Sequence, residues 1–248
     1  MIHCFQSADE LVEKLSFHFL DFITRDNHSG SQLNIALSGG NTPKAFFRKI
    51  ALNQYKYDRP IPWNKVHLFW VDERCLISRH ADSNFGMTST TLLSKINLHE
   101  NNIHRMRGEN DPGLEALRYA EEIKTQVAMK DGIPVFDCIF LGIGDDGHTA
   151  SIFPDRLDLL TAERICETVK HPVTGQSRVT LTGKPIIQAK RIIFLVTGES
   201  KSLVIKQIMN NEPEAARYPA AYIYYKKNDA DWFMDAAAAK LLKSSTLW

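Results

Sequence analysis

The chain of 248 residues carries 30 basic and 29 acidic side chains, which give a formal net charge of +1. This near balance excludes the broad basic surface of a protein that binds nucleic acid or an anionic membrane, so any anion site must be local. The amino terminus lacks the basic-then-apolar pattern of a signal peptide, and no apolar run is long enough to span a bilayer. We therefore expect a cytoplasmic protein with no nucleic-acid or membrane partner.

A capping-box sequence opens the first predicted helix. Ser7-Ala8-Asp9-Glu10 precedes apolar residues at helical spacing from Leu11 to Ile23. The apolar run at residues 33–37 then predicts a strand that ends at Ser38-Gly39-Gly40. After it, Thr42-Pro43 predicts the N-cap and first turn of a second helix.

The same order of strand and helix returns along the chain. Further strands are predicted at residues 66–71, 136–141 and 192–196, and further helices at 83–96, 111–127 and 200–209. Such alternation is typical of a mostly parallel sheet. We predict an α/β fold in which a mostly parallel, twisted sheet is flanked by helices on both faces.

The tail predicts a short strand at residues 232–234 and a closing helix at 235–242, because four consecutive alanines favour a helix. We find no internal repeat, low-complexity tract or Gly/Ser-rich linker, so residues 1–248 are predicted to form a single domain. A monomer is the default expectation. The four cysteines are widely spaced without a CxxC pair, which is typical of reduced thiols.

Ligands of open parallel sheets bind beyond the carboxyl ends of the strands, so the loops there are the candidate site. The first loop combines Gly39 and Gly40 with the hydroxyls of Ser38 and Thr42 before a helix, which suits a phosphate. When the loop is considered alone, an ordinary turn before a helix explains these residues equally well. Its position at a strand end favours binding.

Asp72, Glu73 and Arg74 place three charges directly after an apolar strand. They are either an internal salt-bridge cluster or a binding site in which Arg74 contacts substrate oxygens and the two acids orient it. We favour the binding site, because such charge clusters concentrate at functional positions.

Residues 142–147 match the pattern GxGxxG after a predicted strand, which is typical of dinucleotide binding. We reject that function because Asp145 and Asp146 would face the pyrophosphate. His148 is the best candidate for acid–base chemistry, since imidazole titrates near neutrality and Asp146 can orient it. The eight other histidines, including His18, His67 and His171, are predicted to be packing or surface residues. No paired-histidine spacing supports a metal site.

Two further cations are candidates for phosphate binding. Lys201 follows the last clear strand, where its ammonium would reach a phosphate, although a solvated lysine at a helix start is the usual alternative. Arg178 is a similar but weaker candidate.

Several of these segments together resemble the 6-phosphogluconolactonases, and the resemblance spans nearly the whole chain. The segments are Ser38 to Pro43, Asp72 to Arg74 with Asp82 to Gly86, Asp146 to Pro154, Arg178 to Thr182, Thr197 to Lys201 and Trp232 to Asp235. The run that contains His148 is the most specific. Two departures from the family pattern are Asn41, where serine is frequent, and Gly183-Lys184, where an apolar residue and proline are usual.

The resemblance implies a modified Rossmann-like fold without a cofactor and hydrolysis of 6-phospho-D-glucono-1,5-lactone, a step of the oxidative pentose phosphate pathway. His148 would be the general base, and Arg74 and Lys201 would bind substrate and phosphate. Our hypothesis is that His148 activates water, Arg74 and backbone N–H groups hold the oxyanion, and the first loop and Lys201 hold the phosphate.

Two other functions remain as alternatives. Glucosamine-6-phosphate deaminases resemble the chain too, but they have a catalytic glutamate where Phe153 stands here. A non-catalytic sugar-phosphate sensor would need a DNA-binding module, and the residues before the first predicted strand form only one helix without a basic stripe.

Overall fold

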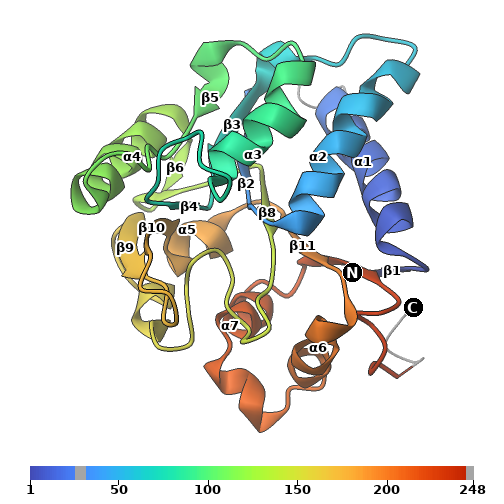
Figure 1. Cartoon of the computed structure of the whole chain (residues 1–248), viewed down its shortest axis with the longest axis vertical. Coiled ribbons are helices and arrows are strands. Elements are labelled where there is room, and N and C mark those ends of the chain that lie inside the picture. Colours follow the sequence, from blue (N-terminus) through green and yellow to red (C-terminus); the bar gives the residue numbers. More distant parts are fainter. Residues whose placement is uncertain (26–31, 244–248) are drawn as a thin grey trace.

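The centre of the fold is a seven-stranded sheet in which every neighbouring pair of strands runs parallel (Figure 1). The computed structural model describes residues 1–25 and 32–243. The strands lie in the order β1 (Ile2–Phe5), β12 (Asp231–Asp235), β11 (Ile192–Val196), β8 (Cys138–Leu141), β2 (Leu33–Leu37), β3 (Val66–Trp70) and β5 (Ile103–His104).

Helices cover both faces of this sheet. The helices on one face are α1 (Ala8–Thr24), α2 (Asn41–Asn53) and α3 (Asn84–Thr91). Those on the other face are α4 (Pro112–Gln126), α5 (Gly183–Gln188), α6 (Ser202–Met209) and α7 (Pro219–Lys226). Each face has its own cluster of buried apolar side chains, and the central strands β2, β3, β8 and β11 are buried along their whole length. The predicted α/β architecture is confirmed.

The first helix begins as its sequence predicts. The Ser7 hydroxyl accepts a hydrogen bond from the Glu10 backbone N–H, and the Glu10 carboxylate accepts one from the backbone N–H of Gln6. The apolar stripe from Leu11 to Ile23 is buried against the sheet. Among the described residues, no helix is both long and apolar enough to cross a membrane.

Short 3₁₀ turns link the main elements in the described part of the chain. They lie at Gln54–Lys56, Trp63–Lys65, Leu93–Lys95, Glu100–Asn102, Leu157–Leu160, Glu199–Lys201 and Pro213–Arg217. The helix predicted at residues 83–96 is therefore split, because α3 ends at Thr91 and a 3₁₀ turn follows it.

A second, antiparallel sheet lies beside the carboxyl ends of the central strands. It consists of β4 (Asp72–Arg74), β10 (Ser177–Leu181) and β9 (Cys166–Lys170). A separate hairpin joins β6 (Met129–Lys130) to β7 (Ile133–Pro134). The prediction that residues 72–74 form a loop was wrong, because this segment pairs with β10 directly after it leaves β3.

Two other local predictions were wrong. Gly40, not Thr42, is the N-cap of α2, since the helix already begins at Asn41. The tail beyond β12 forms turns rather than a helix. There the Ala236 N–H donates to the Phe5 carbonyl. Further on, the N–H groups of Lys240 and Leu242 donate to carbonyls three residues back rather than four, which forms turns instead of an α-helix.

The chain reverses its winding direction between β2 and β8. From β2 the chain continues outward to β3 and β5, whereas from β8 it continues to β11 and β12 on the other side. The loops after β2 and β8 therefore leave the sheet in opposite directions. Such a switch point opens a crevice at the carboxyl ends of the strands, which is where ligands bind in sheets of this kind.

Candidate active site

The loop after β8 contains a close pair of an aspartate and a histidine. The Nδ1 atom of His148 lies 2.6 Å from Oδ1 of Asp146, and the same oxygen accepts a hydrogen bond of 3.1 Å from the His148 backbone N–H. About 27% of the His148 side chain is exposed, which leaves the ring accessible to a ligand. The structure thus brings together the acid and the histidine that the sequence paired.

Gly144 and Gly147 allow the tight turn in which Asp146 and His148 meet. A Cβ atom on Gly144 would lie 2.1 Å from Nδ1 of His148 and 2.5 Å from Oδ1 of Asp146, so a side chain at this position would collide with both. Gly147 has a φ of +79°, which side chains other than glycine rarely adopt. The GxGxxG match therefore reflects a tight turn around the Asp146–His148 pair and not a cradle for pyrophosphate.

Burial alone would raise the pKa of Asp146, but the hydrogen bond and the charge of His148 outweigh it and hold the pKa at about 2. Asp146 is therefore a carboxylate at neutral pH. A carboxylate that accepts from Nδ1 leaves Nε2 as the unprotonated nitrogen of a neutral imidazole.

Two arginines from the antiparallel sheet face each other beside this pair. Arg74 of β4 is directly opposite Arg178 of β10, so both side chains project from the same face. The Nε atom of each is buried without a hydrogen-bond partner among the described residues. Arg74 donates from Nη1 to the carbonyl oxygen of Asp82 at 2.5 Å. Facing cations of this kind favour a bound anion, because the anion relieves their mutual repulsion.

Asp72 connects the arginines to the loop that carries His148. Its Oδ2 accepts a 2.6 Å hydrogen bond from the Ser151 hydroxyl and lies 4.0 Å from Nη1 of Arg178, which itself donates to Ser151 at 3.3 Å. The Arg178 guanidinium also lies over the ring of Phe153, 5.6 Å from its centre. Burial lowers the pKa of Arg178 from its ordinary value.

Glu73 points into the protein rather than toward the crevice. Its carboxylate accepts hydrogen bonds from the backbone N–H groups of Arg74, Asn84 and Phe85 and from the Ser83 hydroxyl, at 2.7 to 3.0 Å. Burial raises the pKa of Glu73 from its ordinary value, and these bonds oppose the rise. Glu73 thereby fixes the first turn of α3 to the strand that carries Arg74.

The first predicted loop is tied to its neighbours. The Ser38 hydroxyl donates to the carbonyl oxygen of Phe140 at 2.8 Å, which joins the ends of β2 and β8. The hydroxyls of Thr42 and Thr197 lie 2.6 Å apart and join the loops after β2 and β11. Gly39 and Gly40 lie between these two contacts, directly before α2.

Lys201 reaches across to the loop after β8. Its Nζ atom lies 2.5 Å from Oδ1 of Asp145, which also accepts a 3.0 Å hydrogen bond from the Ser200 hydroxyl. The bond from Lys201 lowers the pKa of Asp145. In the sequence, Asp145 argues only against a nucleotide site, whereas in the structure it accepts from the lysine that we predicted to bind phosphate.

The chain is similar to known proteins along nearly its whole length. Residues 6–232 match the family described as glucosamine-6-phosphate isomerases/6-phosphogluconolactonase. The chain belongs to this family. It is 41% identical to the 6-phosphogluconolactonase of Aggregatibacter actinomycetemcomitans over 96% of this chain and 98% of that protein. It is 40% identical to the 6-phosphogluconolactonase of Haemophilus influenzae over the same shares. The resemblance seen in the motifs is confirmed.

A solved structure of the same family has the same fold. The crystal structure of devB protein superposes with a TM-score of 0.89 at 39% identity, covering 98% of this chain and all of that chain. The sheet with helices on both faces is therefore the architecture of this family, and the crevice lies at its switch point.

His171 lies near the crevice, although nothing in the sequence indicates this position. His171 was assigned to packing or the surface, yet its ring lies against Phe153 with centres 5.1 Å apart, and Phe153 lies against His148 at 4.8 Å. The residue follows β9 in an irregular stretch, and no local motif marks it. Only the pairing of β9 with β10 brings it to the crevice.

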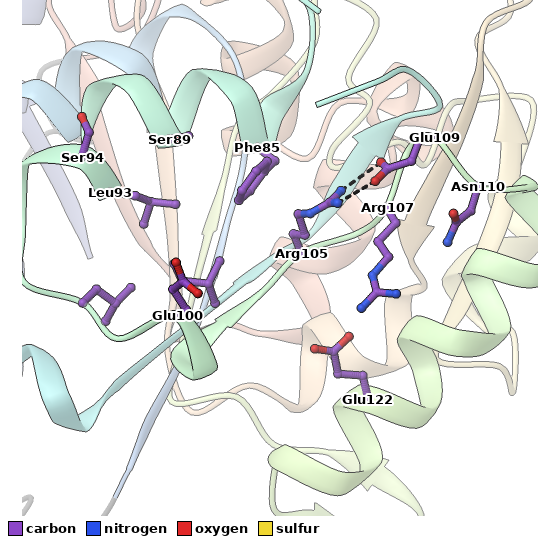
Figure 2. Close-up of a pocket in the computed structure, with 12 residues that line it drawn as sticks. Phe85, Ser89, Leu93, Ser94, Glu100, Arg105, Arg107, Glu109, Asn110 and Glu122 are labelled. Carbon is purple, nitrogen blue, oxygen red and sulfur yellow. Dashed lines mark hydrogen bonds and ion pairs between the residues drawn. The ribbon is translucent and has the colours of Figure 1, made fainter. Parts of the chain in front are cut away.

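A hollow of about 710 Å³ lies elsewhere on the protein, between α3, β5 and α4 (Figure 2). None of the predicted site residues lines it. Its Arg105 forms two hydrogen bonds with Glu109, at 2.6 and 2.9 Å, so these two charges neutralise each other. The accessible histidine lies at the crevice instead.

Proposed function

We propose that the protein hydrolyses 6-phospho-D-glucono-1,5-lactone to 6-phospho-D-gluconate, as part of the oxidative pentose phosphate pathway in the cytoplasm. The relatives that carry the lactonase name support the substrate class. The observation that carries the mechanism is the 2.6 Å contact between Asp146 and Nδ1 of His148, because it prepares Nε2 as a base.

In this mechanism, neutral His148 takes a proton at Nε2 as the oxygen of a water molecule attacks the lactone carbonyl carbon. Asp146 stabilises the imidazolium that forms. The tetrahedral intermediate then collapses, the bond between carbon and the ring oxygen breaks, and His148 returns its proton to that oxygen. The products are a hydroxyl group and a carboxylic acid, which ionises to a carboxylate and releases one proton to solvent. The ring thus opens without a covalent enzyme intermediate.

The Arg74–Arg178 pair would stabilise the oxyanion on the former carbonyl oxygen. The two guanidinium groups face each other across neighbouring strands, and the Phe153 ring contacts both Arg178 and His148. Donors fixed in place before the reaction stabilise developing charge without reorganisation. The loop from Ser38 to Thr42 and the ammonium group of Lys201 would hold the phosphate at the other end of the substrate.

Phe153 argues against a deaminase. Its ring is fully buried and packs against His148, at the position where deaminases of the same family carry a catalytic glutamate. A hydrocarbon ring transfers no proton, so the chemistry that deamination needs at this position is missing.

The test is acid release from freshly generated 6-phosphogluconolactone, measured above the spontaneous rate. We expect rapid hydrolysis by the wild type and a loss of about 10²- to 10⁴-fold in kcat for His148→Gln. Wild-type protein that leaves the spontaneous rate unchanged would refute the proposed reaction. An unimpaired His148→Gln variant would keep the reaction but exclude His148 as its base.

A further inference from the structure

The ring of His171 has a defined proton arrangement. His171 begins the turn between β9 and β10, and its Nδ1 atom accepts hydrogen bonds from the backbone N–H groups of Val173 and Thr174, each 3.2 Å long. A nitrogen that accepts from two N–H groups does not itself carry a proton, so the neutral ring carries its proton on Nε2. No acceptor for this Nε2–H is present among residues 1–25 and 32–243.

The surroundings of His171 place that free donor beside the reacting groups. The Phe153 ring contacts His171 edge-on at 5.1 Å, His148 at 4.8 Å and the guanidinium of Arg178 at 5.6 Å. His171, His148 and Arg178 therefore all pack against a single aromatic ring. The turn is held by two backbone hydrogen bonds of 2.9 Å, from His171 to Gln176 and from Gly175 to His171.

Burial and neighbouring positive charges favour the neutral form of the His171 ring. Burial lowers its pKa from the ordinary value near 6.5, and the positive charges of Arg178 and His148 lower it further, while Asp146 opposes them. A neutral ring with its proton on Nε2 is a hydrogen-bond donor that does not compete with His148 for the proton of the attacking water.

We propose that His171 is a substrate-binding residue that donates from Nε2 to a substrate oxygen held beside Arg178. This role rests on the proposed function, because it places His171 at the lactone end of that substrate. His171 orients the lactone against His148 and transfers no proton. The two guanidinium groups attract the substrate by charge, and a neutral hydrogen-bond donor beside them fixes the position of one substrate oxygen.

Two substitutions separate this role from a purely structural one. In His171→Asn the side-chain oxygen still accepts from the backbone N–H groups of the turn, but the donor at the Nε2 position is lost. In His171→Gln the amide nitrogen supplies a donor near the Nε2 position, but the acceptor at the Nδ1 position is lost. His99→Asn is the matched control, because Nδ1 of exposed His99 also accepts from a backbone N–H two residues ahead.

The readouts are kcat and KM for the lactone and the calorimetric affinity for 6-phosphogluconate. We expect His171→Asn to weaken 6-phosphogluconate binding and kcat/KM by about ten- to hundredfold, His171→Gln to restore part of the loss, and His99→Asn to match the wild type. The thermal midpoint of His171→Asn should stay near that of the wild type.

Other outcomes overturn the inference. A His171→Asn variant with wild-type binding excludes the donor role, and a variant that unfolds, or a His171→Gln variant that is worse than His171→Asn, assigns the residue to the turn. Wild-type protein that binds 6-phosphogluconate without hydrolysing the lactone refutes the proposed function alone, and His171 is then judged by binding. Wild-type protein that does neither refutes both.

Discussion

Arg74 and Arg178 lie directly opposite each other on neighbouring antiparallel strands, and the Nε atom of each is buried without a partner in the described part of the chain. Like charges at such positions repel each other. The fold therefore maintains a repulsion that a bound anion would relieve, and this gives a direct test of the site.

We expect 6-phosphogluconate at about one hundred times its Kd to raise the free energy of unfolding of the wild type by about 2.7 kcal/mol. The Arg74→Met variant should lose most of this stabilisation. Without ligand it should be as stable as the wild type or more so, because one of the two facing charges is gone. Differential scanning calorimetry with and without ligand measures both effects.

The control for this experiment is Arg156→Met, because Arg156 is paired with Asp158 outside the crevice. It should keep the full ligand effect. If Arg74→Met responded to 6-phosphogluconate as strongly as the wild type, the arginine pair would not be an anion site.

The pH dependence of stability should reveal Asp146. Its pKa is lowered to about 2 in the folded protein, against about 4 for an ordinary aspartate. A lowered carboxyl pKa stabilises the fold above the ordinary value, and this contribution is lost as the pH falls through about 2. Between pH 4 and 2 the wild type should therefore lose stability more steeply than Asp146→Asn, as measured by urea unfolding at each pH.

The same Asp146→Asn variant should lose about 10²- to 10⁴-fold in kcat at neutral pH, since an amide neither fixes the His148 proton on Nδ1 nor stabilises an imidazolium. Asp131→Asn, an exposed change in the hairpin between β6 and β7, serves as the control. Equal acid slopes for the wild type and Asp146→Asn would contradict the assignment of the lowered pKa.

Lys201 and Asp145 should have opposite effects on KM. Lys201→Met removes the ammonium that we expect to hold the phosphate, so KM for the lactone should rise by about tenfold or more with a smaller change in kcat. Asp145→Asn removes the carboxylate that now accepts from Lys201, so KM should stay the same or fall.

Lys206→Met is the matched control, because Lys206 also lies on α6 but is paired with Glu212. Steady-state kinetics at two ionic strengths completes the test, since added salt should weaken binding by the wild type more than by Lys201→Met. An unchanged KM in Lys201→Met would remove this lysine from the phosphate site.

Glu73→Gln should destabilise the protein by about 1–3 kcal/mol, measured by urea unfolding at pH 7. The buried carboxylate accepts four hydrogen bonds, and the NH₂ group of a glutamine would face at least one of these donors. Glu121→Gln on the exposed face of α4 is the control. Equal stability of Glu73→Gln and the wild type would show that the four bonds contribute little.

The sequence predicts the larger elements of this fold well, because they depend on periodic apolar runs and helix caps. Ser7 caps α1 as expected, and β2, β3 and β11 lie where the apolar runs place them. What the sequence does not reveal depends on partners distant along the chain. The segment from Asp72 to Arg74 is a strand only because β10 pairs with it.

The candidate site shows the same difference between local features, which the sequence reveals, and long-range contacts, which it does not. Asp146 and His148 are two residues apart and were paired from sequence alone, whereas Asp145 and Lys201 meet only in three dimensions. His171 has no distinguishing neighbours in the sequence, and a hairpin turn carries it to Phe153. Thr42 was read as a helix cap, but its hydroxyl is bonded to Thr197.

The first and last strands of the sheet are neighbours, with Ile2 in register with Trp232. During synthesis on the ribosome, nearly the entire chain is therefore made before the partner of β1 emerges, and one edge of β11 also stays unpaired until the same strand follows it. Until then both expose unpaired backbone edges, which are sites of aggregation. A nascent chain stalled before residue 231 should therefore require a chaperone, even though His148 and both arginines have already been made.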